Sequence, residues 1–198
     1  MTGGCSLVVL AGGRSRRMGA DKATLAAGRQ TLTERIVERL GAVVDEIIVA
    51  AGDNHIDPVP GRIVQDHFPG AGPLAGIHAG LRAAAFDNAW VVACDYPDVD
   101  PGIGLLLVEA ASGVDAAVPV IAGRRQGVCA VYSIRLASRI ERLIASGERR
   151  LGALLESSLV RYLDEAELRE VDPELASFRN LNTPADYEEW VRSTRARH

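Results

Sequence analysis

The chain has 198 residues, of which 47% are hydrophobic, and a formal net charge of −4 at pH 7. A chain of this length predicts a single domain over residues 1–198, and it buries about 70% of its unfolded surface without needing a disulfide or a metal. The apolar content excludes intrinsic disorder, and 20 glycines and 9 prolines exclude a coiled coil. The mild acidity argues against nucleic acid as a partner, because phosphate contacts with a duplex usually require a basic face.

Three cysteines are scattered at Cys5, Cys94 and Cys129. Their spacing matches neither a disulfide framework nor a C-x-x-C metal or redox motif, so we predict three buried thiols in a reducing compartment. The amino-terminal residues lack the basic and apolar regions of a secretory signal, and no apolar run approaches the roughly 18 residues of a membrane span. We therefore expect a soluble cytoplasmic protein with no membrane partner.

Short apolar runs alternate with longer helical patterns along the chain. In chain order, the patterns predict a strand at 6–11, a helix at 31–40, strands at 46–50 and 62–65, a helix at 73–85, a strand at 89–94, a helix at 103–111, strands at 116–121 and 128–132, helices at 135–145 and 151–157, a strand at 170–171 and a final helix from 184. Thr31 and Glu34 form a capping box at the start of the first helix. The strands at 116–121 and 128–132 are candidates for a hairpin.

This alternation predicts an α/β fold, a three-layer Rossmann-like sandwich with a mostly parallel sheet and helices on both faces. Residues 145–182 are less regular and are expected to form a small appendage. In open α/β sheets ligands bind beyond the carboxyl ends of the strands. Candidate functional residues are therefore those that directly follow each strand.

The segment after the first strand, residues 10–22, is rich in glycine and basic residues. Gly12 and Gly13 let the backbone approach a ligand, and the only acid among the basic residues is Asp21. Guanidinium forks, an ammonium group and backbone N–H groups suit phosphate oxygens, so the loop predicts a polyphosphate site. It is neither a Walker A loop nor a G-x-G-x-x-G motif, and the alternative is a solvated basic loop. Its basic residues are Arg14, Arg16, Arg17 and Lys22.

Two carboxylates occupy equivalent positions after later strands. Asp66 follows the third predicted strand and Asp95 follows the fourth. Magnesium takes hard oxygen ligands and commonly uses one or two protein carboxylates together with phosphate oxygens. An Asx turn is the alternative for either residue alone, but two carboxylates and a cationic loop at one sheet edge favour a metal–nucleotide site.

Two other segments, 70–76 and 147–150, each allow two interpretations. The glycine-rich stretch 70–76 is either a surface for part of a ligand or a tight turn before a helix. Residues 147–150 are either a solvated turn or a second basic contact for a phosphorylated substrate. The four histidines show no metal spacing, and His78 on an apolar helix face is predicted to be a partly buried, hydrogen-bonded residue and not a catalyst.

Five segments together resemble the molybdenum cofactor guanylyltransferase family, in the family's order and over nearly the whole chain. The Arg-Met-Gly-x-Asp-Lys ending of the first segment is the most specific of these motifs. The segments are LAGGRSRRMGADK (10–22), GPLAG (72–76), ACDYP (93–97), GERR (147–150) and NLNTP (180–184).

The resemblance implies a nucleotide-diphospho-sugar transferase fold and a Mg²⁺-dependent reaction. In that reaction GMP passes from GTP to the terminal phosphate of molybdenum-molybdopterin, and pyrophosphate is released. It implies that Asp95 binds Mg²⁺ and GTP, that Lys22 and Arg17 act on the triphosphate in catalysis, and that Asn180 and Asn182 line the pterin side. The remaining nucleotide contacts it implies are Leu10, Ala11, Gly12, Gly13, Asp66, Gly72 and Gly76.

The family further implies molybdenum-insertion proteins and recipient molybdoenzymes as partners. Two other functions stay open from the residues alone. One is a related nucleotidyltransferase that uses CTP or another phosphorylated acceptor. The other is a nucleotide-binding protein without catalysis, against which the intact Lys22 and Asp95 argue.

Overall fold

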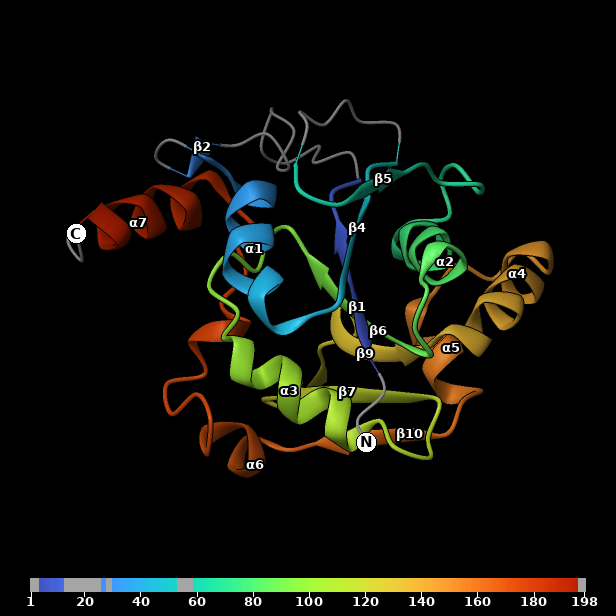
Figure 1. Cartoon of the computed structure of the whole chain (residues 1–198). Coiled ribbons are helices and arrows are strands. Elements are labelled where there is room, and N and C mark those ends of the chain that lie inside the picture. The colour runs from blue at the N-terminus through green and yellow to red at the C-terminus, as the bar shows by residue number, and fades with distance from the viewer. Residues whose placement is uncertain (1–3, 13–25, 28–29, 53–58, 196–198) are drawn as a thin grey trace.

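One eight-stranded mixed sheet organises the described part of the chain. The structure, a computed structural model, describes residues 4–12, 26–27, 30–52 and 59–195 (Figure 1). The strands are β1 (Cys5–Leu10), β2 (Ala26–Ala27), β3 (Gln30–Thr31), β4 (Glu46–Ala50), β5 (Arg62–Val64), β6 (Asn88–Ala93), β7 (Ala116–Ile121), β8 (Arg124–Arg125), β9 (Cys129–Ser133) and β10 (Val160–Leu163). The α-helices are α1 (Leu32–Leu40), α2 (Pro73–Ala83), α3 (Pro101–Ala110), α4 (Ala137–Ala145), α5 (Leu151–Glu156), α6 (Glu165–Arg169) and α7 (Pro184–Arg195).

The sheet has the order β10-β7-β9-β6-β1-β4-β5, while β8 pairs only with β7, and β2 and β3 form a separate ribbon. The central strand β1 is parallel to β4 and β6, and β4 is parallel to β5. The strand β9 lies between β6 and β7 and is antiparallel to both. This confirms the mostly parallel sheet and the antiparallel pairing of β7 with β9.

Two details of the carboxyl-terminal third differ from the sequence prediction. The strand expected at 170–171 is wrong, because these residues form a turn after α6. The strand β10 was not predicted and pairs in parallel with β7. Residues 145–182 therefore contribute an edge strand to the main sheet.

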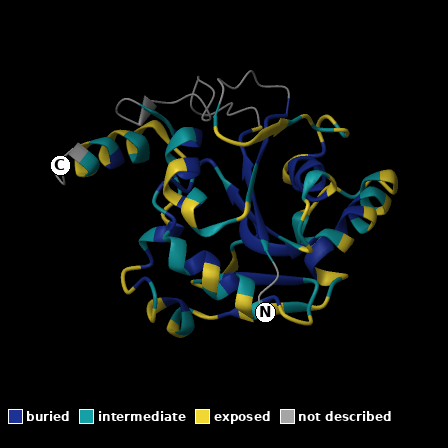
Figure 2. Ribbon diagram, in the orientation of Figure 1, coloured by how far each residue is buried: buried dark blue, intermediate teal, exposed yellow. Residues whose placement is uncertain are grey.

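Alternate residues of the central strand enter two separate hydrophobic cores. Leu7 and Val9 pack with α1 and α3, whereas Val8 and Leu10 pack with α2 and α4. Successive side chains of a strand point to opposite faces, so a continuous apolar run produces this three-layer arrangement. Figure 2 shows the buried sheet between helices whose outer faces are exposed. None of the helices within the described residues is long and apolar enough to cross a membrane.

The last helix, α7, packs against the rest of the described structure through apolar and polar contacts. Leu32, Leu181 and Trp190 form a small buried cluster. The indole Nε1 of Trp190 donates to Asp98 Oδ2 at 2.7 Å, and Arg35 pairs with Asp98 Oδ1 at 2.9 Å while its guanidinium lies over the Trp190 ring. The segment before α7 is thereby held near the loop that follows β6.

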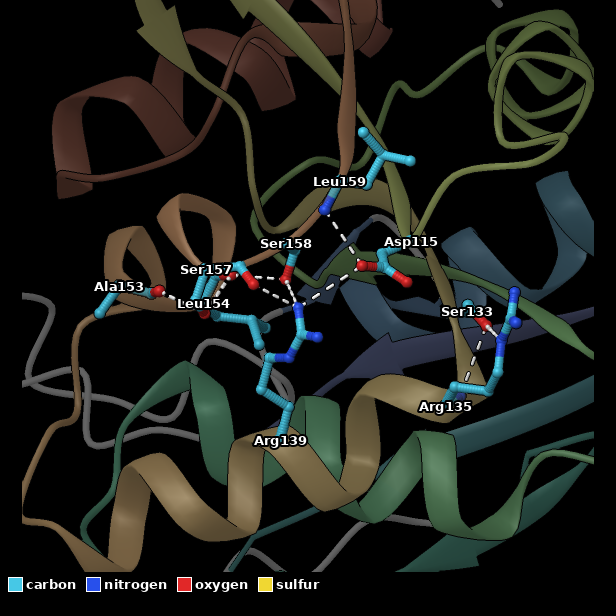
Figure 3. A network of polar contacts seen from close by, with 9 residues as sticks. All are labelled: Asp115, Ser133, Arg135, Arg139, Ala153, Leu154, Ser157, Ser158 and Leu159. Carbon is cyan, nitrogen blue, oxygen red and sulfur yellow. Dashed lines mark hydrogen bonds and ion pairs between the residues drawn. The ribbon is translucent and has the colours of Figure 1, made fainter.

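A second polar network joins α4 to the amino ends of β7 and β10 (Figure 3). One Arg139 nitrogen, Nη1, donates to the Ser157 carbonyl, to Ser158 Oγ at 3.0 Å and to Asp115 Oδ2 at 3.4 Å. The same carboxylate oxygen accepts the Leu159 N–H at 3.0 Å. The network lies at the sheet edge opposite to the carboxyl ends of these two strands.

We expect Arg139→Ala to lower the free energy of unfolding by about 2 kcal/mol, because hydrogen bonds to charged groups are lost in a half-buried site. Urea denaturation measures this loss. The matched control is Arg82→Ala, which removes an exposed guanidinium 4.0 Å from Glu141. The control should cost less than about 1 kcal/mol. Equal losses in both variants would contradict a structural role specific to Arg139.

Candidate active site

The carboxyl ends of β1, β4, β5 and β6 form one edge of the sheet, and those of β1 and β4 are at the top of Figure 1. Backbone hydrogen bonds extend the parallel pairing beyond the strands. Ala11 N–H donates to the Ala50 carbonyl at 2.9 Å, and Cys94 N–H donates to the Leu10 carbonyl at 3.1 Å. Residues that follow different strands are therefore held at fixed positions on this edge, as the sequence predicted for Gly12, Asp66 and Asp95.

Gly12 and Gly52 bring the ends of β1 and β4 into backbone contact. A Cβ atom on Gly12 would lie 2.9 Å from the Gly52 nitrogen. Gly52 has a φ of +59°, in the left-handed region that favours glycine, and a Cβ atom there would lie 3.1 Å from the Gly12 Cα atom. Neither position has room for a side chain. The backbone contact between Gly12 and Gly52 therefore fixes the position of the chain at the end of β1.

Asp66 lies beside this glycine contact. Its Oδ2 atom is 3.4 Å from the position that a Gly52 Cβ would take, and its Oδ1 atom is buried and 3.8 Å from the corresponding position on Gly76. A Cβ on Gly76 would also meet Leu10 at 3.1 Å. The structure thus brings Leu10 and Gly12, from the end of β1, together with Asp66 and Gly76 from two later segments.

Asp95 stands at the end of β6, with its Oδ1 atom buried. Its backbone carbonyl accepts the Leu181 N–H at 2.9 Å, which brings the segment 180–182 to the same edge. Burial raises the pKa of Tyr96, and the half-buried Asn180 side chain lowers it. Asn182 is exposed and donates its backbone N–H to Asp186 at 3.0 Å, as part of the turn before α7.

The turn before α2 contains two exposed glycines, Gly70 and Gly72, which have no side chain to cover the backbone. Gly72 has a φ of +63° at the start of the helix, and a Cβ there would have no atom within 4 Å. Arg149 reaches this turn and donates to the Gly70 carbonyl at 3.3 Å. The segment 147–150 therefore lies next to the glycine-rich stretch, which is compatible with either interpretation of these basic residues.

Cys5, Cys129 and His78 are buried, structural residues. Burial raises the pKa of Cys5 to about 11, and burial together with the charge of Asp95 raises that of Cys129 to about 12. Because the thiolate is the reactive form, these two thiols are not nucleophiles at neutral pH. His78 is buried and its Nε2 lies 2.8 Å from Glu141 Oε1, which confirms the predicted hydrogen-bonded residue.

Gly52, Tyr96 and Gln126 also lie at this edge and were not predicted from the sequence. The sequence does contain a sign of Gly52. An Ala-Gly pair, Ala51 and Gly52, follows the buried strand β4, just as Ala11 and Gly12 follow β1. Tyr96 and Gln126 meet only through tertiary structure, at 3.1 Å. Three predicted site residues, Gly13, Arg17 and Lys22, lie outside the described residues.

Comparison with known proteins agrees with this arrangement. The model of the MobA-like NTP transferase domain matches residues 7–165. A probable molybdenum cofactor guanylyltransferase of Methanosarcina mazei is 40% identical over 200 residues, which cover 94% of this chain and 89% of that protein. The crystal structure of molybdopterin-guanine dinucleotide biosynthesis protein A from Archaeoglobus fulgidus matches with a TM-score of 0.83 and 28% identity, covering 96% of this chain and 99% of that one.

A more distant structure, 2-C-methyl-D-erythritol 4-phosphate cytidylyltransferase from Thermus thermophilus, has a TM-score of 0.72 at 19% identity and covers 95% of this chain and 98% of that one. At this identity the likeness shows the nucleotidyltransferase fold alone. The family model and the relative from Methanosarcina mazei cover most of the chain and confirm the resemblance found in the sequence motifs. The chain therefore belongs to the MobA-like NTP transferase family, among the molybdenum cofactor guanylyltransferases.

Proposed function

We propose that this protein transfers GMP from GTP to the terminal phosphate of molybdenum-molybdopterin and releases pyrophosphate. The observation that carries the proposal is the cluster of Gly12, Gly52 and Asp66 beside the end of β1, with Asp95 at the end of the adjacent β6. The names of relatives that align over most of the chain support the choice of substrates.

The reaction needs no nucleophilic side chain. A terminal phosphate oxygen of the pterin forms a bond to the α-phosphorus of GTP, and the bond between the α-phosphorus and the bridging oxygen to the β-phosphate breaks. The phosphate monoester is already anionic, so catalysis consists of alignment and charge neutralisation. The high pKa of Cys129, caused first by its burial, fits a mechanism without a covalent enzyme intermediate.

The residues at the edge fit a magnesium site. No group of three or more histidine, cysteine, aspartate or glutamate residues within the described ranges is arranged to hold a metal. Magnesium typically needs only one or two carboxylates together with phosphate oxygens, and the carboxylate of Asp95 is a hard oxygen donor of that kind. When bound with the nucleotide, Mg²⁺ would supply positive charge against the triphosphate.

We assign the other residues by position in the family motifs. Backbone groups of Leu10, Ala11, Gly12 and Gly13 would approach the nucleotide, with Asp66, Gly72 and Gly76 on the same side. Asn180 and Asn182 would face the pterin. The acceptor would then lie near the loop that follows β6, because the Leu181 N–H donates to the Asp95 carbonyl there.

We expect Lys22→Ala to lower turnover about a hundredfold, because a positioned charge on the triphosphate is worth roughly 2.7–4 kcal/mol in the transition state. Lys22→Arg retains the charge and serves as the control, with a smaller loss. Steady-state release of pyrophosphate measures both variants. Near-normal turnover of Lys22→Ala would remove Lys22 from the mechanism.

The test of the function is pyrophosphate release with GTP, Mg²⁺ and molybdenum-molybdopterin, compared with CTP and ATP. The proposal expects release with GTP only, and only when the acceptor is present. Release with CTP would assign the protein to another nucleotidyltransferase reaction. GTP binding without release in the presence of the acceptor would indicate a non-catalytic nucleotide-binding protein.

We further propose that the enzyme acts in the cytoplasm, handing its product to molybdenum-insertion proteins or to recipient molybdoenzymes. The three buried thiols fit a reducing compartment. Fractionation of cells that produce the protein, followed by pull-down with a molybdoenzyme, would test both statements.

A further inference from the structure

Arg35, Asp98 and Trp190 form a triangle of side chains from three separate elements. The guanidinium of Arg35, on α1, donates through Nη2 to Asp98 Oδ1 at 2.9 Å, and its Cζ atom lies 5.2 Å from the centre of the Trp190 ring. The other oxygen of Asp98 accepts the indole N–H of Trp190, on α7, at 2.7 Å. Each of the three side chains therefore contacts the other two, and α7 is held beside α1 (Figure 1).

The triangle is largely shielded from water. The side chains of Arg35 and Asp98 are 22% and 25% exposed, and Trp190 is 8% exposed. A partly buried ion pair is screened less than one on the surface, and a planar, weakly hydrated guanidinium suits both a carboxylate and an aromatic face. Because both oxygens of Asp98 have a donor, the orientation of the indole is set by Asp98 and Arg35 together.

The indole in turn fixes the segment that precedes α7. Trp190 packs with Leu32 of α1 and with Leu181 in one small buried cluster. The N–H of Leu181 donates to the Asp95 carbonyl at 2.9 Å. Leu181 is thus held through its side chain by the triangle and through its backbone by the residue at the end of β6. Since the cluster is small, displacement of the indole would remove much of the apolar contact of Leu181.

The same guanidinium also holds the backbone of the loop that follows β6. Nε of Arg35 donates to the Pro97 carbonyl at 3.2 Å. Arg39, one helical turn later, donates from its own Nε to the Val99 carbonyl at 2.7 Å. Both arginines hold this loop, but of the two only Arg35 belongs to the triangle. The pair therefore allows an effect on the loop to be separated from an effect on the segment 180–182.

We propose that Arg35 is a positioning residue for the acceptor substrate. Through the indole of α7 it fixes Leu181, and therefore the asparagines on either side of it, relative to Asp95. The inference rests on the proposed function, in which these two asparagines lie on the pterin side. It adds a residue of α1, outside the five motif segments, that acts on the acceptor and not on GTP.

The test is Arg35→Ala in the full chain, measured by amide hydrogen exchange and by steady-state kinetics for each substrate. We expect exchange in the segment 180–182 to become about tenfold faster, while exchange in β1 and β4 stays unchanged. The KM for molybdenum-molybdopterin should rise about tenfold, as for loss of one hydrogen bond to a charged group. The KM for GTP, and kcat at saturating acceptor, should stay within about twofold of the wild type, because only binding of the acceptor is weakened.

Two milder variants keep the test independent of any folding defect in Arg35→Ala. Trp190→Phe retains an aromatic ring but loses the N–H that Asp98 accepts, so it should change the exchange and the acceptor KM in the same direction by a smaller factor. Arg35→Lys keeps the positive charge beside Asp98 but lacks the planar fork. It should restore part of the acceptor affinity that Arg35→Ala loses.

Arg39→Ala is the matched control. It removes an arginine from the same helix that holds the same loop, but it leaves the triangle intact. This variant should lower stability and leave both the exchange in the segment 180–182 and the acceptor KM unchanged. Equal changes in Arg39→Ala and Arg35→Ala would overturn the inference, since general loosening of the loop would then explain them.

The outcomes separate this inference from the proposed function. Unchanged exchange and an unchanged acceptor KM in Arg35→Ala and Trp190→Phe would contradict the positioning role and leave the proposed reaction intact. Faster exchange with an unchanged acceptor KM would also contradict it, because the segment would then move without consequence for the substrate. Wild-type protein that neither binds nor guanylylates molybdenum-molybdopterin would overturn the proposed function and this inference together.

Discussion

Asp95→Asn is expected to lower turnover about a thousandfold, since one positioned electrostatic contact in a transition state accounts for factors of 10²–10³. The substitution keeps the size of the side chain and removes its charge. The Oδ1 atom of this carboxylate is buried at the end of β6, where water compensates poorly for a lost charge. The variant should also need more Mg²⁺ for its remaining activity.

Asp98→Asn is the control for Asp95→Asn. Asp98 lies three residues further along the same loop, but its carboxylate pairs with Arg35 and accepts from Trp190. We expect this variant to loosen the attachment of α7 and of the segment 180–182, while the Mg²⁺ requirement and the kcat at saturating acceptor stay close to those of the wild type. Full turnover of Asp95→Asn with an unchanged Mg²⁺ dependence would contradict the assignment of Asp95 as the metal ligand.

Gly12→Val is expected to lower turnover several hundredfold, because misplacing a catalytic group by about 1 Å can already cost a hundredfold. A Cβ at this position would lie 2.9 Å from the backbone nitrogen of Gly52, so the ends of β1 and β4 must separate. Leu10, Ala11 and Gly12, which the proposed function places against the nucleotide, would be displaced with them. Circular dichroism at the assay temperature establishes that the variant is folded.

Gly113→Ala is the control for Gly12→Val. Gly113 has a φ of +75°, but a Cβ there would meet nothing within 4 Å, and the residue lies before β7, at the other edge of the sheet. Backbone strain should lower stability by about 1 kcal/mol and leave turnover unchanged. A valine variant that is folded and turns over as fast as this control would contradict the role of Gly12.

Local patterns predicted most of the fold. Continuous apolar runs identified β1, β4 and β6, and the capping box at Thr31 identified the start of α1. They failed at β10, which has only four residues, two of them exposed, and is held by pairing with one neighbour. Equally, no local pattern shows that β9 inserts between β6 and β7, because strand order depends on tertiary contacts.

The sequence predicted those residues of the candidate site that directly follow a strand. Asp66 and Asp95 were located by the rule that parallel strands place their carboxyl ends at one edge. The Gly12–Gly52 contact and the Tyr96–Gln126 hydrogen bond were not, because each joins segments separated by at least 30 residues in the sequence. Sequence patterns report which residues follow a strand, whereas side-chain geometry decides which of them meet.

A crystal structure of the protein with GTP and Mg²⁺ tests the central claim most directly. We predict that the triphosphate lies along the backbone from Leu10 to Gly13, with Lys22 on the phosphates and a carboxylate oxygen of Asp95 on the metal. A triphosphate bound elsewhere, distant from both Gly12 and Asp95, would contradict the assignment of this sheet edge as the nucleotidyl-transfer site.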